Sequence, residues 1–341
     1  MKKIRPFFIA LILIQMGCSS MRNHDHYSVS DHFDGTHFFN PWGNNVSKSL
    51  WDVLKWRFST TPGPWPTQVV NSAQPQLLPK GAKGSVHITY VGHATALIQD
   101  GVFSILTDPQ WSDRASPIQF LGPKRIRQPG VELSKIDRVD LVLISHNHYD
   151  HMDLPTLREL DQLFHPLFVV PLGNAHILQS EGITNVKELD WWSTEGIVQL
   201  VPVQHWSTRS IMDRNQALWG GYVITISGKR IFFAGDTGYG PHFKMIHQRL
   251  GSVDLSLLPI GAYEPRWFMR DQHMNPEDAV KAHLDLGSQK SFAIHFETFR
   301  LTDESFSDPR EFLKKALINA HLSEKDFFAP EVGETLILNN E

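Results

Sequence analysis

The chain has 341 residues, of which 41% are hydrophobic and 20% charged, so it can bury a large core and is not a disordered chain. Its formal net charge of −4 argues against broad nucleic-acid binding, and no nucleic-acid partner is expected. The single cysteine, Cys18, excludes an intrachain disulfide and a multi-thiolate zinc site, whereas eighteen histidines point toward metal chemistry.

The first residues have the pattern of a secretory leader. Three cations among the first five residues precede a short apolar run at 7–14. The leader resembles a bacterial lipoprotein signal, in which residues 1–17 are removed and Cys18 is acylated, although Gln15 stands where that motif has an apolar residue. Ser19, rather than Asp, favours the outer membrane. We therefore expect a cell-envelope protein, lipid-anchored through Cys18 to the outer membrane and facing the periplasm. An ordinary cleaved leader and an uncleaved anchor are the alternatives.

Two further segments precede the main domain. Residues 18–36 are polar and predict a tether, and residues 37–84 form an aromatic, Pro-rich extension with a short helix near 48–58. Four histidines of this region are interpreted as solvated linker residues rather than metal ligands: His24, His26, His32 and His37.

From residue 85 onward, strand patterns come first and helical patterns interleave later. The predicted strands are 86–91, 103–107, 140–145, 197–203, 219–226, 230–234, 254–259 and 291–295. The predicted helices are 155–163, 174–181, 241–250, 276–286 and 309–320, several of which begin at proline. This order predicts one hydrolase domain, residues 85–341, of stacked sheets flanked by helices.

The densest group of candidate metal ligands follows the predicted strand at 140–145. It comprises His146, His148, Asp150 and His151 within six residues. Imidazoles and carboxylates suit zinc, and alternate residues of an extended chain can point at one ion, as His146 and His148 would. Asp150 and His151 emerge on the following turn, where they can serve a second ion.

Three more candidate ligands each end an apolar strand, namely His205, Asp236 and His295. A ligand at a strand end is held by a rigid sheet, which a metal site needs. Each of the three alone is compatible with an ordinary strand end. Together with the histidine-rich run they predict a metal centre.

These ligands resemble those of the metallo-β-lactamase family. Narrower segments are similar to the N-acylphosphatidylethanolamine-hydrolysing phospholipases D over about residues 85–305: 92–95 (GHAT), 106–109 (LTDP), 114–117 (RASP), 122–125 (GPKR), 234–239 (AGDTGY) and 260–269 (IGAYEPRWFM). The resemblance implies an α/β fold, an αββα sandwich of two stacked mixed sheets flanked by helices.

The resemblance also implies a centre of two Zn²⁺ ions per chain, with iron or manganese as alternatives. One zinc would be held by His146, His148 and His205. The other would be held by Asp150, His151 and His295. Asp236 would bridge both ions, which would hold a hydroxide for attack on a phosphodiester.

Three residues near the ligands are given supporting roles by the same resemblance. His273 would face the substrate as a hydrogen-bond donor and, with Asp236 and Asp150, completes the catalytic set. Asp108 would orient a ligand histidine. His93 would be structural, hydrogen-bonded beneath the site.

The implied substrate is a membrane phospholipid, N-acylphosphatidylethanolamine, cut to N-acylethanolamine and phosphatidic acid. Trp206, Trp267 and Phe268 are candidate contacts with its acyl chains, and core packing is the alternative for each. A basic cluster would either meet anionic headgroups or lie in a solvated loop: Lys124, Arg125 and Arg127. A homodimer is also implied.

Glu297 is a departure from the resembling phospholipases, which have Trp-Gly-Thr where this chain has Phe296-Glu297-Thr298. A carboxylate pointing into the site would contact and repel an anionic phosphodiester. That outcome keeps open the hydrolysis of a lactone, a β-lactam or another carbonyl ester on the same metals. A carboxylate pointing away would be a scaffold change. A non-catalytic metal-binding envelope lipoprotein is the third hypothesis.

Overall fold

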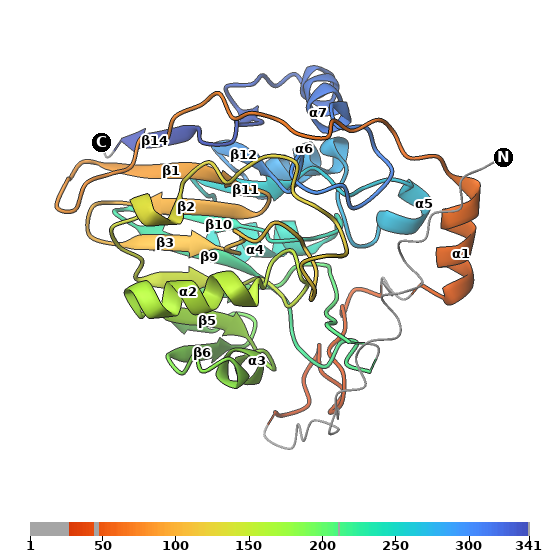
Figure 1. Ribbon diagram of the computed structural model, residues 1–341, viewed down its shortest axis with the longest axis horizontal. Helices are drawn as coiled ribbons and strands as arrows, with labels where there is room; N and C mark the ends of the chain where they lie inside the picture. Colours follow the sequence, from red (N-terminus) through yellow and green to blue (C-terminus); the bar gives the residue numbers. More distant parts are fainter. Residues whose placement is uncertain (1–26, 44–47, 211, 340–341) are drawn as a thin grey trace.

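The computed structural model describes residues 27–43, 48–210 and 212–339. It consists of two seven-stranded mixed sheets stacked face to face, with helices on their outer faces (Figure 1). This αββα arrangement confirms the predicted fold class.

The first sheet runs antiparallel from β14 to β3 and parallel from β3 to β6. Across the sheet its strands are β14 (Thr335–Asn339), β1 (Ser85–Gly92), β2 (Thr95–Gln99), β3 (Ser104–Thr107), β4 (Leu141–Leu143), β5 (Leu167–Pro171) and β6 (Val186–Leu189). The parallel part is covered by α2 (Leu154–Phe164) and α3 (Ala175–Ser180), and η2 (Leu133–Lys135) precedes β4.

The second sheet has the complementary plan, parallel from β13 to β10 and antiparallel from β10 to β7. Across the sheet its strands are β13 (Phe327–Phe328), β12 (Lys290–Ile294), β11 (Leu255–Pro259), β10 (Lys229–Phe233), β9 (Gly221–Ile226), β8 (Val198–Val201) and β7 (Thr194–Glu195). Its helices are α4 (His242–Leu250), α6 (Pro276–Asp285) and α7 (Asp308–Asn319), while α1 (Leu50–Ser59) and α5 (Arg266–Met269) lie together at one end of the molecule (Figure 1).

Every predicted strand and helix overlaps an observed element of its kind, but several strands were missed. β2 and β5 are short apolar runs, and β2 is buried throughout. Such runs lack the alternation that distinguishes a strand from a buried helix. β13 pairs with β12, and β14 pairs with β1. β1 lies far from β14 in the sequence, so the local pattern did not indicate this pairing.

The core is built in two layers because successive strand residues point to opposite faces. Ile98 and Ile105 lie in the cluster between the sheets, whereas Leu97 and Leu106 pack on the side of α2 and α3. Tyr222 of the second sheet donates to the carbonyl oxygens of Ile144 (2.9 Å) and Val169 (3.0 Å) in the first. The two sheets are therefore joined by buried hydrogen bonds as well as by apolar contact.

The N-terminal segment differs from its prediction. Phe33 and Phe38 are each 1% exposed, with ring centroids 4.5 Å apart. His32 is buried, lies 2.6 Å from Asp31 and 2.7 Å from Asp190, and stacks on Trp191. The expectation of a solvated His32 is thus wrong, and so is a free tether for the described residues 27–36.

The reason is that Phe33 of this polar stretch and Phe38, just after it, pack into the hydrophobic core. Burial acts to lower the pKa of His32, but its hydrogen bonds to Asp190 and Asp31 outweigh burial and raise the pKa. His37 is exposed, as expected. His24 and His26 lie outside the described residues.

The leader at 1–17 and Cys18 also lie outside the described residues, so cleavage and acylation stay predictions. Among the described helices, none is both long and apolar enough to cross a membrane. The extension at 37–84 crosses the domain surface, where Trp65 donates to the Glu304 carbonyl oxygen (2.8 Å) and Gly63 to that of Asp303 (2.7 Å).

Phe33→Ala tests the structural role of the N-terminal segment. Deleting a fully buried ring leaves a cavity, so we expect the free energy of unfolding to fall by about 3 kcal/mol. Chemical denaturation would measure it, with Val29→Ala as the matched control because Val29 is 71% exposed. If Phe33→Ala were as stable as Val29→Ala, the packing of Phe33 would contribute nothing to stability, and the predicted tether would stand.

Candidate metal centre

The candidate ligands lie where strands of both sheets end. Because parallel strands of one sheet end at the same edge, their following loops meet there. Asp108 follows β3, and residues 145–151 follow β4 in the first sheet. Asp236 follows β10 and His295 follows β12 in the second. The stacking of the sheets brings the two sets of loops together.

The first group of ligands consists of His146, His148 and His205. His148 Nδ1 lies 2.9 Å from His146 Nε2 and 3.3 Å from His205 Nε2. Three imidazole nitrogens that converge in this way are suited to one cation, since tetrahedral zinc with Zn–N bonds of about 2.05 Å separates its ligand nitrogens by about 3.3 Å. The structure thus brings together the three histidines predicted for one metal.

The second group surrounds the carboxylate of Asp150. Its Oδ2 lies 2.9 Å from His93 Nε2, 3.3 Å from His295 Nε2 and 3.5 Å from His151 Nε2. The predicted ligands Asp150, His151 and His295 are therefore together, and His93 joins them. His93 was expected beneath the site, and its contact with Asp150 places it where it can orient that carboxylate.

Asp236 lies between the two groups. Its Oδ2 is 3.1 Å from His151 Nε2, 3.2 Å from His295 Nε2 and 4.0 Å from His205 Nε2. Its other oxygen is buried and has no hydrogen-bond partner among the described residues. The Asp236 carboxylate lies near both groups, and its second oxygen is free to bind another ion. A ligand that bridges two metal ions needs this arrangement, so the residues fit a metal centre.

Hydrogen bonds behind the ligands fix their orientation. Asp108 Oδ2 lies 2.6 Å from His151 Nδ1, and its carboxylate accepts hydrogen bonds from the amide and hydroxyl of Ser145. His205 Nδ1 faces the Gln272 carbonyl oxygen at 3.0 Å. For His151 and His205 the outward Nδ1 is thereby engaged and Nε2 is turned inward, which is a usual way that a protein orients metal-binding histidines. Asp108 was predicted for this role.

Ser145 was missed by the sequence analysis. Its hydroxyl joins Asp108 to His146 Nδ1, which is 2.9 Å away. Its position directly before the ligand run was the only available indication. Gly235 is required opposite it, because a Cβ at that position would lie 2.4 Å from Ser145 Cβ.

Three site residues have left-handed backbone conformations. The φ angles are 56° for His93, 34° for Asp108 and 62° for His295. Such conformations cost non-glycine residues on the order of 1–3 kcal/mol each and concentrate at functional sites. Here they turn side chains at strand ends toward a common centre.

The charges of the site are strongly coupled. Burial acts to raise the pKa of Asp236, but the imidazoles of His151, His295 and His273 hold it well below its usual range. Burial acts to lower the pKa of His295, but Asp236 and Asp150 raise it to about 9. For His148 and His205 burial dominates and lowers each pKa to about 3. The two groups of ligands therefore differ in the protons that a metal must displace.

His273 and Trp206 line the predicted substrate side. His273 Nδ1 lies 3.8 Å from Asp236 Oδ2, is buried, and makes no hydrogen bond to any described residue. The Trp206 ring packs edge to face on His148, with centroids 4.5 Å apart, and the Arg214 guanidinium covers it at 4.2 Å. Both predicted residues are therefore adjacent to the ligands.

Trp267 and Phe268 lie farther out, on α5. Phe268 is buried and packs on Trp56, with ring centroids 4.8 Å apart. Trp267 is 40% exposed. Phe268 is thus a packing residue, while the indole of Trp267 faces solvent.

Glu297 points away from the ligands. Its carboxylate accepts hydrogen bonds from Arg310 Nε (2.8 Å) and an Arg127 guanidinium nitrogen (3.3 Å), and it is 3% exposed. Burial raises the pKa of Glu297, although both arginines act against that shift. Its charge is compensated within the scaffold, so the predicted repulsion of a phosphodiester does not arise.

The predicted basic cluster is divided by the fold. Lys124 is exposed, but Arg125 and Arg127 are buried. Arg125 donates to the carbonyl oxygens of Ser112 and Gln110, and Arg127 pairs with Glu297. A headgroup-binding surface made of all three is therefore wrong, because two of them satisfy internal acceptors.

The N-terminal extension contacts the metal-ligand loop, which the sequence did not indicate. Asn40 Nδ2 donates to the His205 carbonyl oxygen (3.0 Å), and Trp42 Nε1 donates to Gln204 Oε1 (2.9 Å). These residues come from the extension expected to precede the hydrolase domain. They support the loop that carries His205.

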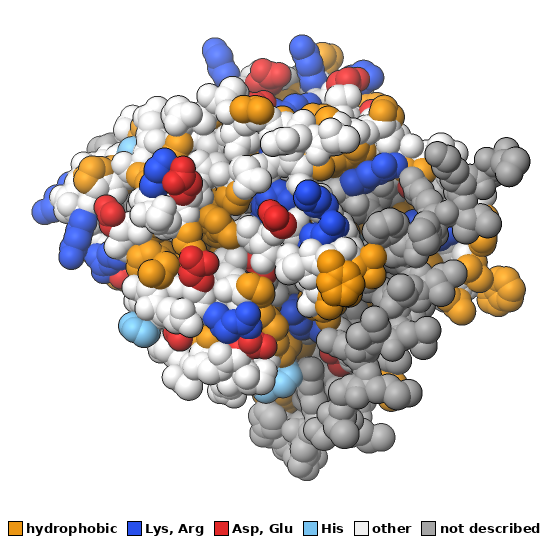
Figure 2. Space-filling view, viewed as in Figure 1, with side chains coloured by type: hydrophobic (Ala, Val, Ile, Leu, Met, Phe, Trp, Pro, Cys, Tyr) orange, Lys and Arg blue, Asp and Glu red, His pale blue; other side chains and the backbone are white. Residues whose placement is uncertain are grey.

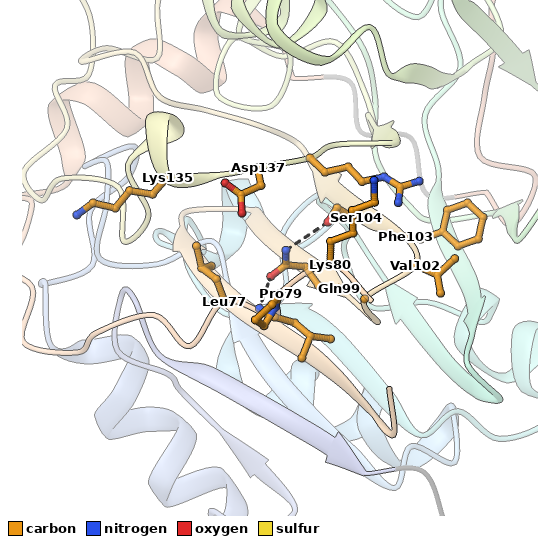
Figure 3. Close-up of a pocket in the computed structure, with 12 residues that line it drawn as sticks. Leu77, Pro79, Lys80, Gln99, Val102, Phe103, Ser104, Lys135 and Asp137 are labelled. Atoms are coloured by element: carbon orange, nitrogen blue, oxygen red, sulfur yellow. Dashed lines mark hydrogen bonds between the residues drawn. The ribbon is translucent and has the colours of Figure 1, made fainter. Parts of the chain in front are cut away.

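A separate cleft lies at the opposite edge of the first sheet (Figure 3). Gln99, at the end of β2, and Ser104, at the start of β3, line it together with Lys80 and Asp137. The candidate ligands follow the other ends of β3 and β4, and none lines this cleft. The chemistry of the cluster is therefore independent of it.

Comparison with known proteins places this geometry in a family. Residues 104–296 match the family described as "Beta-lactamase superfamily domain". The chain belongs to this superfamily. It is 35% identical over 270 residues to N-acyl-phosphatidylethanolamine-hydrolyzing phospholipase D 1 of Caenorhabditis elegans, covering 74% of this chain and 76% of that protein. It is 36% identical over 267 residues to the mitochondrial enzyme of that name from Saccharomyces cerevisiae, and the match covers 75% of this chain and 57% of that protein.

Solved structures of similar fold support the architecture. The chain superposes on isothiocyanate hydrolase from Delia radicum gut bacteria with a TM-score of 0.58 and 20% identity, covering 74% of this chain and all of that one. The superposition on Igni18 of Ignicoccus hospitalis has a TM-score of 0.55 and 20% sequence identity, and it covers 75% of this chain and all of that one. With these homologues and its His/Asp clusters, the protein is a metal-dependent hydrolase.

Zinc binding should depend on pH differently at the two groups. His295 keeps its proton below about pH 9, and the carboxylates of Asp236, Asp150 and Asp108 hold the pKa of His151 well above its usual value against the effect of burial. A metal at this group therefore releases protons from both histidines and binds more tightly as pH rises. His148 and His205, with pKa values of about 3, are already neutral, so the first group releases none from them. Calorimetric titration in buffers of different ionisation enthalpy would measure this. Equal proton release for both ions would contradict it.

Glu297→Gln should destabilise the protein without changing its use of substrate. Losing the buried partner leaves Arg127 with only the half-exposed carboxylate of Glu331, so we expect the free energy of unfolding to fall by about 2 kcal/mol, with KM unchanged within about twofold. Glu331→Gln is the control, since Glu331 is 44% exposed on the same arginines and should cost less than about 1 kcal/mol. Unchanged stability with an altered KM would place Glu297 at the substrate instead.

Proposed function

We propose that this hydrolase is a di-zinc phosphodiesterase of the phospholipase D type, acting on N-acylphosphatidylethanolamine. The products are N-acylethanolamine and phosphatidic acid. The observation that carries the proposal is the Asp236 carboxylate between two groups of candidate ligands, His146, His148 and His205 on one side and Asp150, His151 and His295 on the other. The names of the relatives supply the substrate.

The residues of the site have different roles in the proposed reaction. When bound, two metal ions lower the pKa of water and neutralise charge on a phosphoryl oxygen. Asp236 and Asp150 supply the negative charge that holds the ions, and Asp108 keeps His151 in the required orientation. Burial lowers the pKa of His273 to about 3, so its ring is neutral at pH 7 and can donate a hydrogen bond to a phosphate oxygen without carrying a charge.

The orientation of Glu297 favours a phosphodiester over a carbonyl ester. The carbonyl-ester hypothesis depended on a carboxylate directed into the site, and this carboxylate is bound to Arg127 and Arg310. No anionic repulsion from Glu297 then opposes a phosphodiester. The relatives named for phospholipase D activity supply the positive argument for that class.

The cellular setting remains part of the proposal. We propose that Cys18 carries the lipid anchor, which would hold the enzyme at the outer membrane facing the periplasm. An anchored enzyme meets phospholipids at the surface where they reside. The homodimer implied by the resemblance stays a prediction as well.

Asp236→Asn tests the proposed bridge. The amide keeps the size of the side chain but removes the charge that both groups of ligands share, so activity should fall by about a thousandfold or more while the fold is retained. The assay is release of N-acylethanolamine and phosphatidic acid from mixed micelles, read by mass spectrometry with zinc-reconstituted protein.

Asp137→Asn is the matched control, because Asp137 is an exposed carboxylate in the separate cleft (Figure 3). It should leave turnover unchanged. Full activity of Asp236→Asn would remove the bridging role. Turnover of lactones or β-lactams, with none of the phospholipid by zinc-loaded protein, would overturn the phosphodiesterase proposal.

A further inference from the structure

The helix α1 turns an apolar face toward solvent. Trp51 and Phe58, two turns apart on one face, are 79% and 83% exposed, and Leu50 is 66% exposed. No residue of α1 is buried. Apolar side chains project at the right-hand edge in Figure 2, where Figure 1 places α1. A surface helix ordinarily turns its apolar side chains toward the core, so rings this exposed are unusual for a surface helix.

Basic residues accompany this apolar face. Lys55, one turn after Trp51, is exposed, and its Nζ lies 4.7 Å from the ring centroid of Trp267. Trp267 of α5 is 40% exposed and extends the apolar surface. The other acidic or basic residues of α1 are Asp52, which closes a capping box with Ser49, and Arg57. Aromatic rings beside lysine are the composition of helices that lie in the interface of an anionic bilayer.

The opposite face of α1 connects it to the metal centre. Trp56 packs on Phe268 of α5, with ring centroids 4.8 Å apart, and Lys48 Nζ lies 3.1 Å from Asp271 Oδ2. Two residues after Asp271 comes His273, which faces Asp236. The helix is thus fixed to the element whose following loop delivers a residue into the site.

We infer that Leu50, Trp51, Lys55 and Phe58 of α1, with Trp267 of α5, form a docking surface that inserts into the interfacial layer of an anionic phospholipid bilayer. This inference rests on the proposed function and names the partner that presents the substrate. Inserted rings would hold the enzyme with α5 at the membrane, independently of any lipid on Cys18.

A bilayer fits this surface better than a second copy of the chain. In a symmetric dimer each patch meets itself, so Lys55 would approach its own counterpart, and like charges repel. A stable dimer also buries about 800 Å² per partner, far more than a few side chains on a ten-residue helix offer. An anionic bilayer instead attracts the lysine and accepts the rings.

The test uses the chain from Ser19 to Glu341, which lacks the leader and Cys18 but keeps every helix and strand described. Binding is measured by co-sedimentation with vesicles of phosphatidylethanolamine and phosphatidylglycerol, free of N-acylated lipid so that turnover plays no part. We expect the parent to bind. We expect the affinity of Trp51→Ala/Phe58→Ala for the vesicles to be lower by a factor of about ten or more.

Two further variants separate the causes. Phe312→Ala/Ile318→Ala removes apolar side chains of α7 that are 41% and 64% exposed, and it should bind like the parent. Lys55→Ala should weaken binding about fivefold on vesicles with phosphatidylglycerol and not on pure phosphatidylcholine. Circular dichroism confirms that each variant is folded.

Measurement of substrate hydrolysis gives a second test of the docking surface. Trp51→Ala/Phe58→Ala should lose most hydrolysis of N-acylphosphatidylethanolamine in vesicles while keeping the parent rate on the water-soluble diester bis(4-nitrophenyl) phosphate. If the parent hydrolyses no phospholipid, the proposed function fails, and binding alone still decides the docking surface.

Equal vesicle binding by the parent and Trp51→Ala/Phe58→Ala would overturn the inference. So would a parent dimer in sedimentation velocity that this variant converts to monomer, since the surface would then be an interface between copies.

Discussion

The structure depends on a buried carboxylate, that of Asp236, held within about 3 Å of imidazoles from both sheets. His151 arrives from the loop after β4 and His295 from the end of β12, so the contact spans the two halves of the sandwich. Neither charge could stay buried alone, since desolvating an isolated ion costs far more than one interaction returns. The two sheets must therefore stack in a register that keeps these groups opposed, and the left-handed conformations of His93, Asp108 and His295 are tolerated to achieve it.

The residues behind this centre are held by further hydrogen bonds and ion pairs. Asp108 backs His151, and Ser145 backs Asp108. Farther out, Glu297 lies two residues after His295 and is clamped by Arg127 and Arg310, which also reach Glu331. The carboxylate of Glu297 thus stabilises the loop that follows His295.

The segments around the domain are tied to the same centre. The N-terminal segment closes the core with Phe33 and Phe38, and Asn40 and Trp42 then bind the loop of His205. On another side, α1 packs on α5 and leaves its apolar face outward. A superfamily fold that serves many chemistries owes its specificity to such attached segments rather than to its sheets.

The sequence by itself indicated stacked sheets flanked by helices and candidate metal ligands at strand ends, because apolar runs and short spacings are local signatures. The αββα sandwich and the division of those ligands into two groups came from the resemblance to a known family. The burial of His32, Arg125 and Arg127 and the direction of Glu297 were decided only by the tertiary structure. So were the roles of Ser145, Asn40 and Trp42 and the outward face of α1. The physical reason is that a polar side chain is buried or exposed according to partners brought from distant segments, and a linear pattern of residue types does not contain those partners.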